Sequence, residues 1–230
     1  TGMGVGNFRE LVAEIAVQRP IVIQSHAHWD HIGASWQFDD VFIHQAEADS
    51  LRAGFPNREM RRWFGPDHLL HGENLPETFD IETIEIPGTE PSGTLDHGEV
   101  IDLGGRLLNI LYTPGHSPGG ITVFDRESGI IFPGDAVNYG PIYLEDDDAD
   151  LRAYIETLEM LASCAPSVGS VFPSHYDVPM SPGDLNDASR ALLEIVNSKV
   201  PDRVTKDAEL FRRGRFEFVL APGAIDSLRT

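Results

Sequence analysis

The sequence predicts an α/β fold in which short strands alternate with a few longer helices. Short apolar runs, typical of buried strands, recur between segments whose apolar residues follow helical spacing. Proline and glycine are scattered between these segments, as expected for the turns that join them. This alternation indicates sheets covered by helices, and the 230-residue length fits a single domain spanning residues 1–230.

The first elements are predicted from helix-end signals and periodicity. Asn7 with Glu10 three residues later resembles a capping box, so a helix is expected to begin there and to be stopped by Pro20. The other elements expected in this part of the chain are strands at 21–23 and 41–43, a helix over about 45–53 and a loop over 65–80.

Two longer helices are predicted in the second half of the chain. Leu151, Tyr154 and Leu158 share one face of the first helix, and Ser181-Pro182 opens the second with proline in its first turn. The strands expected around them lie near 81–86, 106–112, 120–125, 129–132 and 168–172, followed by a hairpin over 208–220 around Arg213-Gly214.

Composition excludes several classes of protein. The formal net charge is −20, from 17 Lys and Arg against 37 Asp and Glu, so a nucleic-acid partner is not expected. The apolar runs are too short to cross a bilayer, and the single cysteine excludes a disulfide framework or a cysteine-based zinc finger. The start of the sequence is too short and polar for a secretory signal, so we expect a cytoplasmic protein unless a leader precedes it.

The most informative segment is the histidine-rich run at residues 25–31, which directly follows a predicted strand. His26 and His28 are two residues apart, so in an extended chain both project to the same side and can chelate one ion. Asp30 and His31 follow where the chain turns away and can serve a second ion. Three imidazoles and one carboxylate in so short a run argue against an incidental polar loop.

Three further candidate ligands stand after later strands. His116, Asp135 and His175 each follow an apolar strand and a small turn residue, and functional groups gather at strand ends in α/β sheets. The five histidines and two aspartates together suit two ions that keep open positions for water. His44, by contrast, is expected to cap or pack at the start of a helix.

This set of motifs resembles the metallo-β-lactamase-fold hydrolases, whose hallmark is H-x-H-x-D-H followed by separate His, Asp and His positions. The resemblance covers almost the whole chain. It implies a four-layer αββα sandwich of two mixed β-sheets flanked by helices, with the metals at one edge of the sheets. It also implies that His26, His28 and His116 bind the first metal, that Asp30, His31 and His175 bind the second, and that Asp135 bridges them.

Several positions depart from the pattern of particular branches of the family, which limits the branches to which the chain is similar. Asp135 stands where the true β-lactamases have Cys or Ser, and His28 stands where flavodiiron oxidoreductases have Glu. The nucleases of this fold carry an inserted second domain and need a longer chain. The early strand and hairpin of the family are missing before Thr1-Gly2-Met3-Gly4, so one sheet is expected to lack its first strands.

The resemblance points to a hydrolase that uses a bridging hydroxide between two divalent metal ions. We expect zinc, with iron or manganese as alternatives. Asp30 is the predicted catalytic residue, because its carboxylate can orient the nucleophile and pass its proton to the leaving group. Tyr139 and Tyr143 follow Asp135 closely and are predicted to contact a substrate oxygen.

The expected substrate is a small molecule, namely a carboxylic ester, thioester or lactone. The Gly134-Asp135-Ala136 segment, the Gly140-Pro141-Ile142-Tyr143 run and the acidic stretch and helix that follow resemble the thioester- and lactone-cleaving branches. An acyl-CoA or glutathione thioester is the first choice. The alternatives are an oxidoreductase that resembles persulfide dioxygenases and works with one iron, a phosphodiesterase, and a binding protein without activity. A homodimer is left open.

Overall fold

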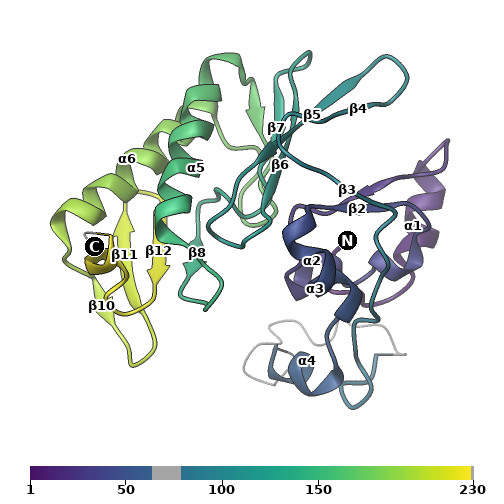
Figure 1. Cartoon of the computed structure of the whole chain (residues 1–230), viewed down its shortest axis with the longest axis horizontal. Coiled ribbons are helices and arrows are strands. Elements are labelled where there is room, and N and C mark those ends of the chain that lie inside the picture. Colours follow the sequence, from purple (N-terminus) through teal and green to yellow (C-terminus); the bar gives the residue numbers. More distant parts are fainter. Residues whose placement is uncertain (64–78, 229–230) are drawn as a thin grey trace. The chain divides into compact units, whose positions relative to one another are not determined.

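The computed structural model describes residues 1–63 and 79–228 (Figure 1). The chain falls into two compact units, Thr1–Leu95 and Asp96–Thr230, which we call the first unit and the second unit. Both combine helices with strands, and the predicted mixed α/β class is confirmed. That the whole chain acts as one domain stays a prediction. The loop predicted over 65–80 lies almost wholly outside the described residues.

The first unit begins with α1 (Phe8–Ile15), which is capped as the sequence predicts. The side chain of Asn7 accepts a hydrogen bond from the backbone N–H of Glu10 at 3.1 Å, which satisfies one of the free donors of the first turn. The first strand among the described residues is β1 (Val22–Ile23).

A small parallel sheet forms the centre of the first unit. β1 pairs with β2 (Val41–Ile43), and β2 pairs with β3 (Gly93–Thr94). The remaining helices of this unit are α2 (Trp29–Ile32), η1 (Ser35–Gln37), η2 (Gln45–Glu47), α3 (Ala48–Ala53) and α4 (Asn57–Trp63).

The strand predicted at residues 81–86 is wrong. Asp80 turns the chain there instead, because its carboxylate accepts the N–H of Glu82 and its carbonyl accepts the N–H of Thr83. Only Ile86 takes up extended pairing, as an isolated bridge with Phe55. The apolar side chains of this segment pack against the core of the first unit without forming a ladder.

The second unit contains two sheets. The larger, five-stranded sheet has the order β4-β5-β6-β7-β9, and only its β7–β9 pair is parallel. The four-stranded sheet has the order β10-β11-β12-β8, with a parallel β12–β8 pair. Their strands are β4 (Val100–Asp102), β5 (Leu107–Tyr112), β6 (Ile121–Asp125), β7 (Ile130–Phe132), β8 (Pro141–Leu144), β9 (Ser170–Val171), β10 (Arg203–Val204), β11 (Glu209–Arg213) and β12 (Phe216–Leu220).

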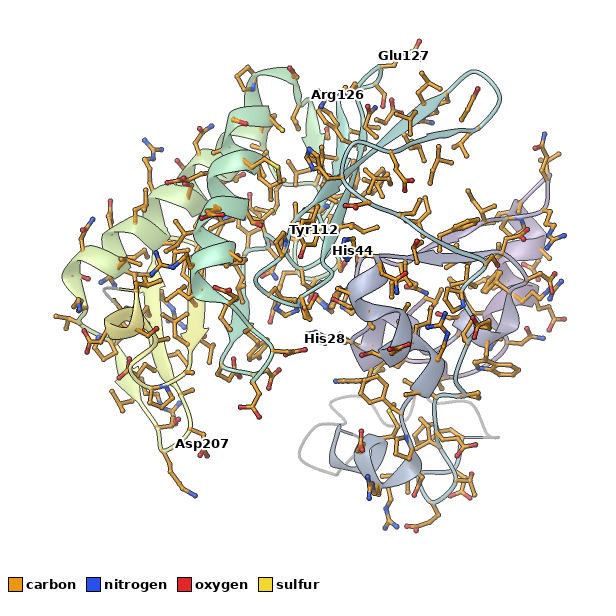
Figure 2. All side chains as sticks on the ribbon, viewed as in Figure 1. His28, His44, Tyr112, Arg126, Glu127 and Asp207 are labelled. Carbon is orange, nitrogen blue, oxygen red and sulfur yellow. The ribbon has the colours of Figure 1, made fainter. Side chains whose placement is uncertain are left out.

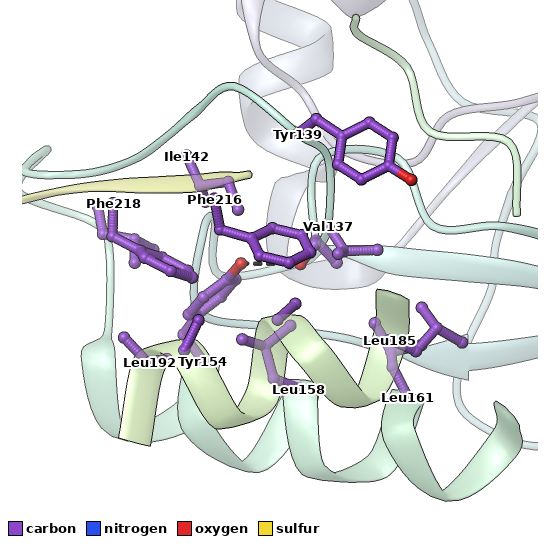
Figure 3. Close-up of a cluster of buried hydrophobic side chains, with 14 of the residues drawn as sticks. Val137, Tyr139, Ile142, Tyr154, Leu158, Leu161, Leu185, Leu192, Phe216 and Phe218 are labelled. Atoms are coloured by element: carbon purple, nitrogen blue, oxygen red, sulfur yellow. Dashed lines mark hydrogen bonds between the residues drawn. The ribbon is translucent and has the colours of Figure 1, made fainter. Parts of the chain in front are cut away.

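Two long helices of the second unit, α5 (Leu151–Cys164) and α6 (Pro182–Ser198), lie where the sequence predicts them. Asp150 caps α5 through its carboxylate, and Ser181 with Asp184 forms a capping box for α6. The two helices pack on a core of side chains from both sheets and both helices (Figure 3). The unit also contains η4 (Ala165–Ser167) and α7 (Ala224–Ser227).

No helix within residues 1–63 and 79–228 combines the length and the apolar character that a bilayer crossing requires.

Shortening a core side chain of α5 is expected to destabilise the second unit. Leu158 is 1% exposed, so Leu158→Ala leaves a cavity and lowers the free energy of unfolding by about 2–5 kcal/mol. The matched control is Leu193→Ala on α6, where the side chain is 36% exposed and the expected change is within about 0.5 kcal/mol. Urea unfolding followed by circular dichroism measures both, and equal effects would contradict this description of the core.

Candidate metal centre

The first unit brings His26, His28 and His31 into one cluster after β1. The ring centroids of His26 and His28 lie 4.5 Å apart, and those of His26 and His31 lie 4.0 Å apart. The first distance agrees with the predicted projection of residues i and i+2 to the same side of an extended segment. Three imidazoles therefore share one small volume at the end of this strand.

A short helix that the sequence did not predict orients the second pair of ligands. His28 precedes α2 (Figure 2), and its carbonyl accepts the N–H groups of His31 and Ile32. This turn places Asp30 beside His31, with 3.5 Å between Asp30 Oδ2 and His31 Nε2. We call His26, His28, Asp30 and His31 the first half-site.

Residues 1–3 lie against the turn that follows His31. The hydroxyl of Thr1 donates to the His31 carbonyl, and the N–H of Gly33 donates to the carbonyl of Gly2. A Cβ at position 33 would lie 2.1 Å from the carbonyl carbon of Met3. Only glycine lets the two backbone segments approach this closely. Contact with the start of the chain therefore holds the turn after the first half-site in place.

The second unit brings His116, Asp135 and His175 together. Asp135 Oδ2 lies 3.2 Å from His175 Nε2 and 3.8 Å from His116 Nε2. The aspartate side chain is only 12% exposed and stands between the two imidazoles. We call these three residues the second half-site.

His116 is oriented by a backbone carbonyl. Its Nδ1 lies 2.7 Å from the carbonyl oxygen of Tyr143 in β8, and because that oxygen can only accept, Nδ1 carries the proton. Nε2 then keeps its lone pair, which is the form of imidazole that binds a metal ion. The sequence does not signal this contact, since every residue has a backbone carbonyl.

The loop that carries His116 is packed tightly on α5. Gly115 has φ +122°, and a Cβ there would lie 2.4 Å from the Cα of Tyr154. The hydroxyl of Thr157 donates to the carbonyl of Pro114, also from α5. The loop therefore depends on a glycine next to the histidine and on the position of the helix.

The other two ligand loops of the second unit are tied to each other and to α5. The N–H of Ser174 donates to the carbonyl of Gly134, so the residues just before His175 and Asp135 are joined. On the other side of Asp135, the carbonyl of Ala136 accepts the hydroxyl of the buried Tyr154. Hydrogen bonds to the backbone carbonyls of Gly134 and Ala136 thus hold the chain on both sides of Asp135.

The two tyrosines predicted to contact substrate have different surroundings. Tyr139 donates its hydroxyl to Asp184, and Arg215 stacks over its ring at 3.4 Å. Burial, together with the charge of Asp184, raises the pKa of Tyr139 to about 12. The ring of Tyr143 is 49% exposed, and partial burial raises its pKa as well. Substrate contact by either residue stays a prediction.

Tyr176, next to His175, adopts a left-handed backbone with φ +64°. Its ring covers Gly140, where a Cβ would lie 2.2 Å from the ring. A glycine at the start of the β8 segment is therefore needed to seat this ring beside the second half-site. Strained conformations of this kind cluster at functional sites.

The donors in both half-sites suit a borderline divalent ion such as Zn²⁺. Zinc is bound by imidazole nitrogen and carboxylate oxygen, and each half-site supplies both kinds of donor in close contact. The proton on Nδ1 of His116 leaves the right atom for coordination. The residues present therefore fit a metal ion chemically, which agrees with the sequence prediction.

Comparison with known proteins identifies the family. Residues 2–175 match the model of the metallo-beta-lactamase superfamily. The chain belongs to this superfamily. The fold agrees, because the solved structure of TTHA1623 in a di-iron-bound form covers 81% of this chain and 85% of its own at a TM-score of 0.56 and 24% identity.

Curated relatives of this metallo-beta-lactamase superfamily chain include named hydrolases. Human acyl-coenzyme A thioesterase MBLAC2 is 31% identical over 167 residues, which cover 71% of this chain and 59% of that protein. A hydroxyacylglutathione hydrolase of Synechococcus is 26% identical over 131 residues, covering 57% and 40% respectively. The chain thus spans about three fifths of the length of its MBLAC2 relative.

Adding a methyl group at Gly115 is expected to disrupt the presentation of His116. Gly115→Ala strains a positive φ and drives Cβ into the backbone of α5, so it should cost more than about 1 kcal/mol of stability and lower zinc binding. The matched control is Gly183→Ala in α6, which has open space and should change stability by less than about 1 kcal/mol. Thermal unfolding and zinc content measure the pair, and wild-type zinc content in Gly115→Ala would contradict the assignment of this loop.

Proposed function

We propose that the two half-sites jointly bind a pair of divalent metal ions and that the protein hydrolyses thioesters. The observation that carries this proposal is the placement of Asp135 between His116 and His175. A carboxylate in that position can serve two ions, whereas a single catalytic zinc uses only about three protein ligands. The seven ligands implied by the family pattern are all present.

The proposed ligand sets are those implied by the family. One ion would be held by imidazoles from both half-sites, and the other by Asp30 with two histidines. Ions held in this way would lower the pKa of a coordinated water toward neutrality and would polarise a substrate carbonyl. The ligand sets are His26, His28 and His116 for one ion, Asp30, His31 and His175 for the other, and Asp135 between them.

Asp30 is the proposed proton carrier of the reaction. Its side chain is 24% exposed and lies beside His31, so it is anchored yet reachable by solvent and substrate. In thioester hydrolysis a water oxygen bonds to the carbonyl carbon, the C–S bond breaks, and the thiolate must receive a proton. The Asp30 carboxylate would accept the proton from water and return it to the leaving sulfur.

Thioesters are the favoured substrate class because of the relatives. MBLAC2 is named for acyl-coenzyme A hydrolysis, and the Synechococcus relative is named for hydroxyacylglutathione hydrolysis. Both named substrates are thioesters of a larger thiol carrier. The exposed ring of Tyr143, whose own carbonyl orients His116, is a proposed contact for the acyl oxygen.

Removing the central carboxylate is expected to abolish most of the activity. Asp135→Ala should lower kcat/KM for an acyl-CoA thioester by about 100-fold or more, because the charge that joins the two ligand groups is lost. Asp102→Asn is the control, since that exposed carboxylate only caps a turn through the N–H groups of Gly104 and Gly105. A thioesterase assay measures both, and wild-type activity in Asp135→Ala would refute the site.

Metal removal provides an independent check. Treatment with a chelator should abolish thioester hydrolysis, and zinc should restore it in proportion to the metal bound, up to two ions per chain. Metal analysis of the restored protein decides between the proposed and alternative chemistries. If the protein instead held one iron per chain and consumed oxygen with a persulfide as the substrate, it would be an oxidoreductase and not a hydrolase.

A further inference from the structure

We infer that Glu47 is a positioning residue that holds His26 and His28 in the geometry needed to share one metal ion. This inference rests on the proposed metal binding and goes beyond it, because Glu47 lies outside the metal-binding motif. Glu47 is 3% exposed, which is rare for a carboxylate and calls for a specific partner.

One partner of Glu47 is the backbone between the two histidines. Its Oε2 accepts a hydrogen bond from the N–H of Ala27, itself 4% exposed. That N–H belongs to the peptide group that joins His26 to Ala27. Fixing this peptide limits the rotation that would otherwise let the two imidazoles diverge.

The hydrogen bond lies just beyond the reach of the strand ladder. β1 pairs with β2 over Val22 and Ile23, and the N–H of Gln24 still donates to the carbonyl of Phe42. At Ala27 the acceptor is a side chain instead of a neighbouring strand. Glu47 thus takes the place of a neighbouring strand as the hydrogen-bond acceptor in the segment that carries His26 and His28.

The sequence folds so that Glu47 reaches this position. β1 and β2 are parallel, so the segments after both strands leave at the same edge of the sheet. After β2, His44 caps η2 (Gln45–Glu47), because its Nδ1 accepts the N–H of Ala46 and its carbonyl accepts that of Glu47. The predicted capping role of His44 is confirmed, and this cap sets the direction of η2.

The proposed role of Glu47 depends on where its acceptor oxygen lies, beside the N–H of Ala27. Glu47→Gln keeps an oxygen acceptor of the same reach, whereas Glu47→Ala leaves the buried N–H of Ala27 without its acceptor.

The test measures metal affinity rather than turnover. The metal-free protein and its variants are titrated with Zn²⁺ in competition with a chromophoric chelator, after circular dichroism has verified folding. Glu47→Ala should weaken zinc binding by about 10–100-fold, as is typical for the loss of a group that orients metal ligands. Glu47→Gln should stay within about threefold of wild type, since position is retained.

The matched control is Asp125→Asn in the second unit. Asp125 is also a buried carboxylate, but it accepts the N–H groups of Glu127 and Ser128 in a turn. Its replacement should leave zinc affinity unchanged even if stability falls. A folded Glu47→Ala with wild-type affinity, or an equal loss in Asp125→Asn, would overturn the positioning role.

Two further results keep the inference separate from the proposed function. If Glu47→Ala fails to fold, Glu47→Asp replaces it, because the shorter side chain keeps the charge but withdraws the acceptor. Weakened zinc binding then supports positioning, and unchanged binding refutes it.

Wild-type protein that binds zinc but cleaves no thioester would refute the proposed function alone, whereas wild-type protein that binds no zinc would refute both.

Discussion

Both half-sites depend on hydrogen bonds that hold the loops after the strands in place. An ion binds well only to donors that are already held close together, since ordering long loops costs conformational entropy. In the second unit, the Ser174–Gly134 bond and the Tyr154 hydroxyl on Ala136 hold Asp135 in place. In the first unit, the short strands β1 and β2 are supplemented by side-chain and backbone contacts around residues 24–33.

The side chains of the two half-sites suit cations. Five imidazoles supply nitrogen donors, and the carboxylates of Asp30 and Asp135 supply negative charge. Buried carboxylates are costly unless they are paired or hydrogen-bonded. Asp135 lies against two imidazoles, and Glu47 accepts a hydrogen bond from a backbone N–H. Each of these buried carboxylates therefore has a defined partner.

The close approach of His26 and His28 could be predicted because their spacing in the sequence is local. His26 and His28 fall on one side of an extended segment by simple alternation, and the longer helices start at recognisable capping residues. The supporting contacts were not predictable in this way. Glu47 and the Tyr143 carbonyl act through partners 20 and 27 positions away, and the segment at 81–86 turns because of a local contact at Asp80.

We propose that residues of both half-sites bind the same pair of metal ions. Anomalous diffraction from zinc-loaded crystals, recorded on both sides of the zinc absorption edge, tests this proposal directly. We expect two peaks about 3.5–4 Å apart, with Asp135 contacting both and His26 and His116 contacting one of them. A single peak bound by one half-site alone, or no peak after zinc loading, would contradict it.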